Sequence, residues 1–157
     1  RAGDTIHVSG PLGGSRFGWH LRFAPPLREG AWLARQPAVT AAIDVSDGLL
    51  LDLATLLQAS GGLGAELAVD AIPIRAAAVR AAGGDDAQAL RHALEDGEDH
   101  ALLWTVAKGR RMAKGGPLSQ RSRVGIGTVT ARPGLWLVHR DGCRERVLPR
   151  GYEHRLG

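Results

Sequence analysis

Cysteine is almost absent from this sequence, which has one cysteine, Cys143, among its 157 residues. A single cysteine can form neither an internal disulfide nor a cysteine zinc site. The six histidines are dispersed, and none forms the i, i+4 pair that binds zinc on a helix, so we expect no zinc. This cysteine usage is typical of a reducing compartment, and we expect a cytoplasmic protein.

Long apolar runs are also missing. No stretch approaches the roughly 20 apolar residues of a membrane-spanning helix, and no secretory signal is visible. We therefore expect no membrane partner. Aromatic residues make up 4% of the chain, and no basic run is interleaved with them, which argues against nucleic acid. The net charge of +4 is a mild excess that is compatible with phosphorylated small molecules.

The remaining composition is that of one globular domain. Apolar residues make up 44% of the chain, enough for a core, and 23% charged residues is too few for disorder. The length suits a single domain. The chain starts at Arg1 and runs directly into a strand-like segment, so we expect residues 1–157 to be one domain of a longer protein.

Strand and helix patterns alternate along the chain. Apolar, partly β-branched segments predict strands over 5–9, 39–45, 65–69, 101–106 and 124–129. A hairpin is expected from 135–139 and 144–148, with Asp141-Gly142 as its turn. Helical spacing predicts helices over 27–34, 49–57, 75–82, 85–94 and 108–118. This order predicts an α+β fold of α/β layers, in which helices flank a mixed sheet.

The segment IDVSDG, residues 43–48, is called here the strand–helix junction. Asp44 ends the predicted strand and Asp47 begins the predicted helix, a place where ligands bind in open α/β sheets. Free N–H groups there bind phosphate, two carboxylates suit Mg²⁺, and the Ser46 hydroxyl can donate to phosphate. The alternative is structural: Ser46 is the N-cap and Asp47 an acid of the first turn. The spacing alone is compatible with both.

Two further segments carry the remaining polar signals. The acidic cluster EDGEDH, residues 95–100, places acids at a helix C-terminus, where they oppose the helix dipole. This favours a function, although a solvated helix end with Gly97 at C′ is the alternative.

The glycine-rich segment SGPLGGS, residues 9–15, is similar to a phosphate-cradling loop but lacks the Lys-Ser/Thr end of a Walker A motif. Its alternative is a plain turn.

Taken together, these motifs resemble one family. The phrases GDTIHVSGPLGGSRFG, AAIDVSDGLLLDL, ALEDGEDHALLWTV, IGTV and GYEH occur in the order seen in thiamine-monophosphate kinase. That family belongs to the superfamily of aminoimidazole ribonucleotide synthetase and selenophosphate synthetase. The resemblance covers essentially the whole chain and matches the family's C-terminal domain, whose mixed sheet is flanked by helices.

The resemblance implies an activity and a set of site residues. The activity is ATP-dependent phosphorylation of thiamine monophosphate to thiamine diphosphate, with Mg²⁺ and usually in a homodimer. By the resemblance, Asp44 and Asp47 are magnesium ligands and Ser46 contacts ATP. Glu98 and Tyr152 then contact the thiamine substrate. The family's N-terminal domain, which carries further acids and much of the ATP site, is absent from this chain, so we expect the chain alone to be inactive.

Two departures from the family pattern keep alternatives open. The usual phrase GGEDYE reads DGEDHA over residues 96–101, and Pro26 stands where an arginine is common. One alternative is a related superfamily enzyme with another substrate, against which the GYEH ending argues. The other is a non-catalytic, degenerate ligand-binding domain, which the altered acidic cluster favours slightly.

Overall fold

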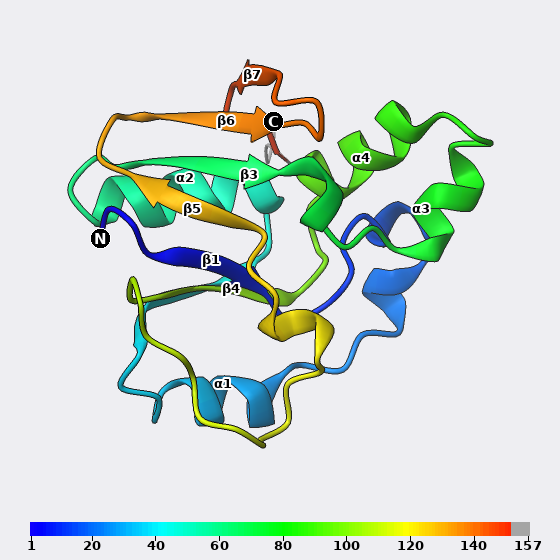
Figure 1. Cartoon of the computed structure of the whole chain (residues 1–157). Helices are drawn as coiled ribbons and strands as arrows, with labels where there is room; N and C mark the ends of the chain where they lie inside the picture. The colour runs from blue at the N-terminus through cyan, green and yellow to red at the C-terminus, as the bar shows by residue number, and fades with distance from the viewer. Residues whose placement is uncertain (152–157) are drawn as a thin grey trace, which may run out of the picture.

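One mixed sheet forms the centre of the structure (Figure 1). The computed structural model describes residues 1–151, and within them seven strands pair in the order β2-β4-β1-β5-β3-β6-β7. Strands β3 and β6 are parallel, and the other neighbouring pairs are antiparallel. The strands are β1 (Thr5–Val8), β2 (Val39–Val45), β3 (Gly64–Ala68), β4 (Ala101–Val106), β5 (Gly127–Thr130), β6 (Gly134–Val138) and β7 (Arg144–Val147).

Strand β4 separates two hydrophobic cores. Successive side chains of a strand point to opposite faces of the sheet. Leu103 belongs to the larger core, whereas the neighbouring Trp104 belongs to a smaller core, and both side chains are fully buried. The sequence ALLWTV of this strand is almost entirely apolar because both of its faces are covered.

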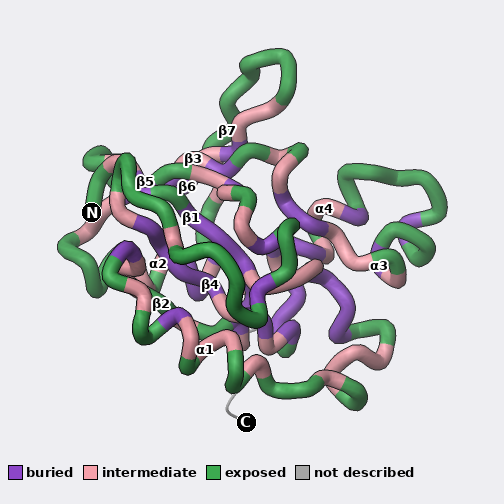
Figure 2. The backbone as a smooth tube through the Cα atoms, turned by 60° about the horizontal axis from the view of Figure 1, so that its bottom comes forward, coloured by how far each residue is buried: buried purple, intermediate pink, exposed green. Residues whose placement is uncertain are grey.

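Helices α2 and α4 cover the larger core. The helices are α1 (Leu27–Leu33), α2 (Leu49–Ala59), α3 (Ala76–Ala81) and α4 (Asp86–Glu95). Helix α2 contacts β2, β3 and α4, and it buries Leu49, Leu53 and Leu57 at the helical spacing visible in the sequence. Figure 2 shows the buried backbone gathered in the sheet and the helix faces next to it, while the hairpin tip beyond β6 is exposed.

Helix α1 and the segment that follows β4 cover the smaller core, where Leu33, Trp104 and Leu118 are buried. The expected helix over 108–118 is wrong, because this segment is irregular. Three of its residues adopt a positive φ that ends helices: Gly109, Gly115 and Gly116. Hydrogen bonds hold the segment in place instead, as when Arg123 donates to the carbonyl oxygen of Ala113 at 3.0 Å.

The expected α+β fold is confirmed, as is the β6–β7 hairpin. In its turn, the N–H of His139 donates to the carbonyl oxygen of Cys143 at 2.9 Å. The strand expected from residue 124 begins at Gly127, because Arg121–Arg123 forms a 3₁₀ turn before it. Among the helices of residues 1–151, none combines the length and apolar character needed to cross a bilayer.

Candidate functional site

The sheet register brings three sequence motifs to one end of the sheet. Val45, at the end of β2, lies opposite Ala101, at the start of β4, so the strand–helix junction meets the acidic cluster. On the other side of β4, Val8 at the end of β1 lies opposite Leu103. The glycine-rich segment therefore leaves β1 at the same end. Segments far apart in sequence thus meet at one end of the sheet.

The strand–helix junction is organised by a buried carboxylate that the motif does not include. Helix α2 begins at Leu49 and its N-cap is Gly48, which has a φ of 117°. The Asp52 side chain, 4% exposed, accepts three backbone N–H groups through Oδ2: Ser46 at 2.9 Å, Asp47 at 3.0 Å and Gly48 at 3.1 Å. The expected cap by Ser46, with Asp47 in the first turn, is wrong because Asp52 in the first turn satisfies these donors.

This arrangement leaves the polar side chains of the junction free. Within residues 1–151, the Ser46 hydroxyl and the Asp47 carboxylate make no hydrogen bond. Asp44 is exposed on the edge strand β2 and lines a largely apolar cavity of about 430 Å³, whose wall also includes Pro26 and His100. The three side chains named by the sequence are therefore available to a ligand.

The donor set of the junction suits magnesium bound together with phosphate. Within residues 1–151, no group of three or more His, Cys, Asp and Glu side chains is arranged to hold a metal ion. Mg²⁺, however, usually takes one or two protein carboxylates and completes its coordination with water and phosphate oxygens. Asp44 and Asp47 are donors of that type, and Asp44 lies at the apolar cavity beside Pro26 and His100.

The glycine-rich segment does direct backbone N–H groups at an anion, but the anion belongs to the protein. Gly13 and Gly14 donate to the two carboxylate oxygens of Asp99, at 2.5 and 3.0 Å. Gly13 has a φ of 81° and lies against the backbone of α4, so this close approach favours glycine there. The interpretation of this loop as a phosphate cradle is wrong for these two N–H groups, because Asp99 occupies them.

The acidic cluster is buried rather than solvated. Asp96 and Asp99 are 6% and 3% exposed, so the alternative of a solvated helix end is wrong for these two acids. The Asp96 carboxylate accepts from Nδ1 of His92 at 2.9 Å and forms an ion pair with Nε of Arg16 at 3.1 Å. Glu98 remains exposed. Of the four acids of the cluster, Asp96 and Asp99 are therefore buried anchors, Glu95 is half-buried and Glu98 is open to solvent.

Burial shifts the titration of the anchoring acids. Desolvation raises the pKa of Asp99, while the N–H groups of Gly13 and Gly14 and the charge of Arg75 act in the opposite direction. Desolvation likewise raises the pKa of Asp52 against its backbone donors. Burial lowers the pKa of Arg75, and the nearby Asp99 opposes this shift.

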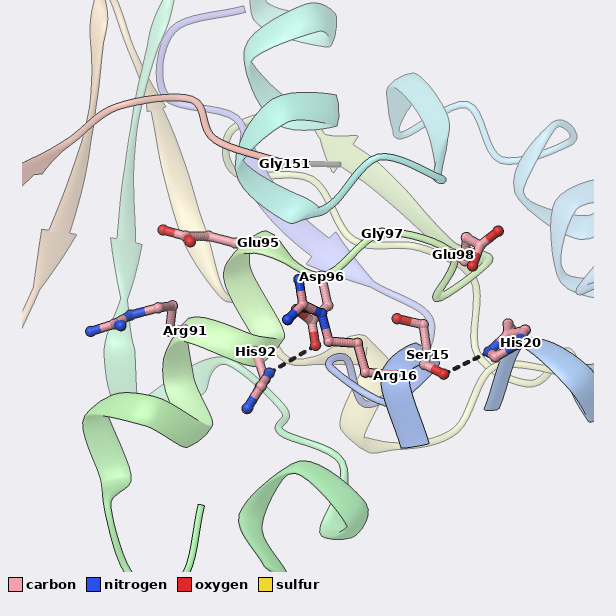
Figure 3. A pocket seen from close by; sticks show the side chains of 10 residues that line it. All are labelled: Ser15, Arg16, His20, Arg91, His92, Glu95, Asp96, Gly97, Glu98 and Gly151. Carbon is pink, nitrogen blue, oxygen red and sulfur yellow. Dashed lines mark hydrogen bonds and ion pairs between the residues drawn. The ribbon is translucent and has the colours of Figure 1, made fainter. Parts of the chain in front are cut away.

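A cavity of about 420 Å³ opens between the glycine-rich segment and the C-terminus of α4 (Figure 3). Figure 3 shows Arg16 and His92, from opposite walls, both close to Asp96. Charged groups of both signs line the cavity: Arg16, Arg91, Glu95, Asp96 and Glu98. Such a lining suits a small ligand that carries both a cationic and an anionic group.

Of the predicted site residues, Glu98 lines this cavity. Its backbone N–H donates to the carbonyl oxygen of Ser46 at 2.6 Å, so the two predicted contacts are adjacent. Gly151, which begins the GYEH ending, also lines it and packs against the backbone of Asp47. Tyr152 lies outside the described residues.

Sequence reasoning missed Asp52, as well as the roles of Asp99 and Arg16. Asp52 did leave a signal, since it is the one charged residue in the apolar run LLLDLATLL of a predicted helix. Asp99 and Arg16 left none, because their partners are 86 and 80 residues away in the sequence, respectively, and only the fold brings them together.

The comparisons with known proteins agree with these motifs. No protein-family model matches the chain. The thiamine-monophosphate kinase of Rhodopirellula baltica is 40% identical over 157 residues, which cover 97% of this chain and 48% of that protein. A solved structure described as AaThiL complexed with AMPPCP and TMP has a TM-score of 0.69 and 27% identity, covering 98% of this chain and 52% of that one. E. coli HypE, a hydrogenase maturation protein, has a TM-score of 0.68 at 21% identity, covering 99% of this chain and 52% of that one, and shows the fold alone.

The fold and its neighbours define a domain of the aminoimidazole ribonucleotide synthetase superfamily. Within this class, the chain is homologous to thiamine-monophosphate kinase, so the resemblance seen in the motifs is confirmed. The chain spans about half the length of the curated relatives it matches.

Proposed function

We propose that the chain is the C-terminal domain of an enzyme that transfers the γ-phosphoryl group of ATP to thiamine monophosphate, giving thiamine diphosphate. The observation that carries this proposal is the direct backbone bond between Ser46 and Glu98. It joins the segment suited to phosphate and magnesium to the acid suited to the substrate. The homologous structure bound to AMPPCP and TMP supports the same pair of ligands.

At the phosphate end, the strand–helix junction supplies oxygen donors. Asp44 and Asp47 would hold Mg²⁺, and the Ser46 hydroxyl would donate to a phosphate oxygen of ATP. Phosphoryl transfer depends on alignment and on stabilising negative charge more than on covalent chemistry. Bound magnesium supplies that charge neutralisation. The backbone N–H groups of Ser46, Asp47 and Gly48, which the sequence suggested as phosphate donors, already bond to Asp52. The phosphate and metal contacts would therefore come from the side chains of the junction.

At the substrate end, the cavity has the size and charge for thiamine monophosphate. Its volume of about 420 Å³ lies in the range of small-molecule sites. The Glu98 carboxylate would face the cationic thiazolium ring, and Tyr152, which follows the cavity-lining Gly151, would add an aromatic contact. Both contacts attract a cation, which distinguishes thiamine from an uncharged acceptor.

The altered acidic cluster is compatible with an intact site. Where the family phrase has glycine, Asp96 is paired with both Arg16 and His92. A buried carboxylate with two partners is a satisfied part of the structure. The structure therefore accommodates the change from glycine to Asp96, and this change does not by itself favour a degenerate domain.

The proposal extends to the whole protein. Its N-terminal domain would complete the ATP and magnesium sites and mediate a homodimer, as the family resemblance implies. A cytoplasmic location is part of the same proposal, and the exposed free thiol of Cys143 suits a reducing compartment.

The test is Asp47→Asn in the full-length gene product that contains this chain. We expect turnover of thiamine monophosphate to fall sharply, because one magnesium donor is lost. Stability should change little, because the Asp47 side chain makes no hydrogen bond within residues 1–151. The matched control is Asp85→Asn, which alters an exposed acid at the start of α4 and should leave turnover unchanged. Equal turnover of wild type and Asp47→Asn would refute the metal role.

A further inference from the structure

The backbone on both sides of Asp99 is in an unfavourable conformation. Glu98 has a φ of 59° and His100 a φ of 50°, and no other non-glycine residue within 1–151 has a positive φ. Side chains disfavour this left-handed region, so it persists only where the surroundings enforce it. Glu98 lines the cavity, and neighbouring groups stabilise this conformation of its backbone.

Three hydrogen bonds hold the backbone of residues 98–100 in place. The N–H of Glu98 donates to the Ser46 carbonyl at 2.6 Å, and the N–H of His100 donates to the Val45 carbonyl at 2.9 Å. Nε1 of Trp19 donates to the carbonyl oxygen of Asp99 at 3.1 Å. Residue 99 thus lies between two backbone bonds to the strand–helix junction, and its own carbonyl is also held.

Within residues 1–151, the hydrogen bonds of the Asp99 carboxylate are the charged link between this segment and the glycine-rich segment. Both carboxylate oxygens accept an N–H, from Gly13 and Gly14, which matches the ionised form. A Cβ atom at Gly13 would lie 2.8 Å from the backbone N of Ala93. The glycines therefore let the loop come close enough to meet the carboxylate. The nearby Arg75 charge offsets part of the cost of burying it.

We propose that Asp99 is a positioning residue for substrate recognition: bonded to Gly13 and Gly14, it holds Glu98 in the left-handed conformation that sets the direction of the Glu98 carboxylate at the cavity. The same bonds fix the two walls of the cavity relative to each other, because Arg16 follows Gly14 on the opposite wall. The identity of the substrate rests on the proposed function, whereas the positioning of Glu98 rests on the geometry.

The test is Asp99→Asn in the full-length gene product. The amide group of Asn places an N–H₂ where a carboxylate oxygen accepted an N–H, so one of the two bonds is lost. We expect the KM for thiamine monophosphate to rise about tenfold or more, because a misplaced contact is costly, while the KM for ATP changes by less than about twofold. In a crystal structure of the variant, φ of Glu98 should leave the positive region.

A double-mutant cycle with Glu98→Gln separates positioning from general damage. If Asp99 acts through Glu98, adding Asp99→Asn to Glu98→Gln causes no further rise in the KM for thiamine monophosphate. Additive rises would overturn the inference. Leu135→Ala is the stability control, since Leu135 is buried in β6 away from the cavity lining. It should lower stability and leave both KM values unchanged at temperatures where it is folded.

A milder variant is available if Asp99→Asn does not fold. Trp19→Phe removes the Nε1 donor to the Asp99 carbonyl and should raise the KM for thiamine monophosphate less, with the rise again absent beside Glu98→Gln. An unchanged KM and an unchanged φ of Glu98, in an active wild type, would refute the inference and leave the proposed function standing. A shifted φ of Glu98 in the variant, together with a wild type that does not turn over thiamine monophosphate, would support the positioning role of Asp99 and refute the proposed function.

Discussion

The Asp52→Ala substitution tests how the strand–helix junction is built. The Asp52 carboxylate is the common acceptor of three backbone N–H groups, those of Ser46, Asp47 and Gly48. Alanine removes the acceptor and leaves the apolar contacts of α2 unchanged. The Gly48 N–H then lies buried without a partner, whereas the Ser46 and Asp47 groups are partly exposed and can be hydrated.

The expected loss of stability follows from these three donors. One buried, unsatisfied donor costs about 1–3 kcal/mol. Loss of the acceptor that caps α2 costs a further ~1 kcal/mol. Burial raises the pKa of Asp52, which means that the carboxylate is itself partly destabilising, and its removal returns some of that energy. The two costs sum to about 2–4 kcal/mol, and the returned energy places the expected fall in the free energy of unfolding of Asp52→Ala at the lower end of that range, about 2 kcal/mol.

Urea unfolding at neutral pH, followed by tryptophan fluorescence and by circular dichroism, measures this loss. Asp85→Ala is the matched control, because Asp85 is also an aspartate at a helix N-terminus but is exposed and accepts one N–H, from Gln88 at 3.0 Å. It should cost only ~1 kcal/mol. Equal losses in the two variants, or a loss below about 0.5 kcal/mol in Asp52→Ala, would refute the reasoning.

Two further predictions concern backbone space and pH. Gly48→Ala should destabilise the chain by more than about 1 kcal/mol in urea unfolding, because the residue has a positive φ and its Cβ would lie 2.9 Å from the Glu95 carbonyl oxygen. The control Gly10→Ala should be near neutral, because the space around Gly10 is open. Equal losses of stability in the two variants would contradict this reasoning. Burial raises the pKa of Asp52 above its ordinary 3.8, so the stability gained from its protonation is present below pH 3.8 and is lost as the pH rises through the higher folded pKa. Asp52→Asn, which cannot ionise, should therefore show a smaller fall in unfolding free energy from about pH 4 upward than the wild type, and identical pH profiles would rule this out.

Local patterns predicted the fold where local forces decide it. The turn residues Asp141-Gly142 predicted the hairpin of β6 and β7. The apolar run ALLWTV predicted strand β4, both of whose faces are buried. The helix expected over 108–118 failed because its glycines adopt positive φ and end helices. Residue spacing gave that segment a helical appearance, but the N–H of Ala113 donates to the distant Gln36 side chain at 3.0 Å instead of to a helical carbonyl.

The candidate site was predictable in its parts but not in its connections. Asp44, Asp47 and Glu98 could be named from the motifs, because acids at element ends are visible in a sequence. The capping role of Ser46 failed because Asp52, six residues further on, competes for the same donors. The bond of Asp99 to Gly13 spans 86 residues, and no local pattern encodes it.

The most direct test of the central claim follows the transferred phosphoryl group itself. The full-length gene product is incubated with Mg²⁺, γ-labelled ATP and thiamine monophosphate, and the labelled products are separated by chromatography. The account predicts label in thiamine diphosphate, with no product when the 157-residue chain replaces the full-length protein. Active full-length protein that hydrolyses ATP or phosphorylates another acceptor, and forms no labelled thiamine diphosphate, would contradict it.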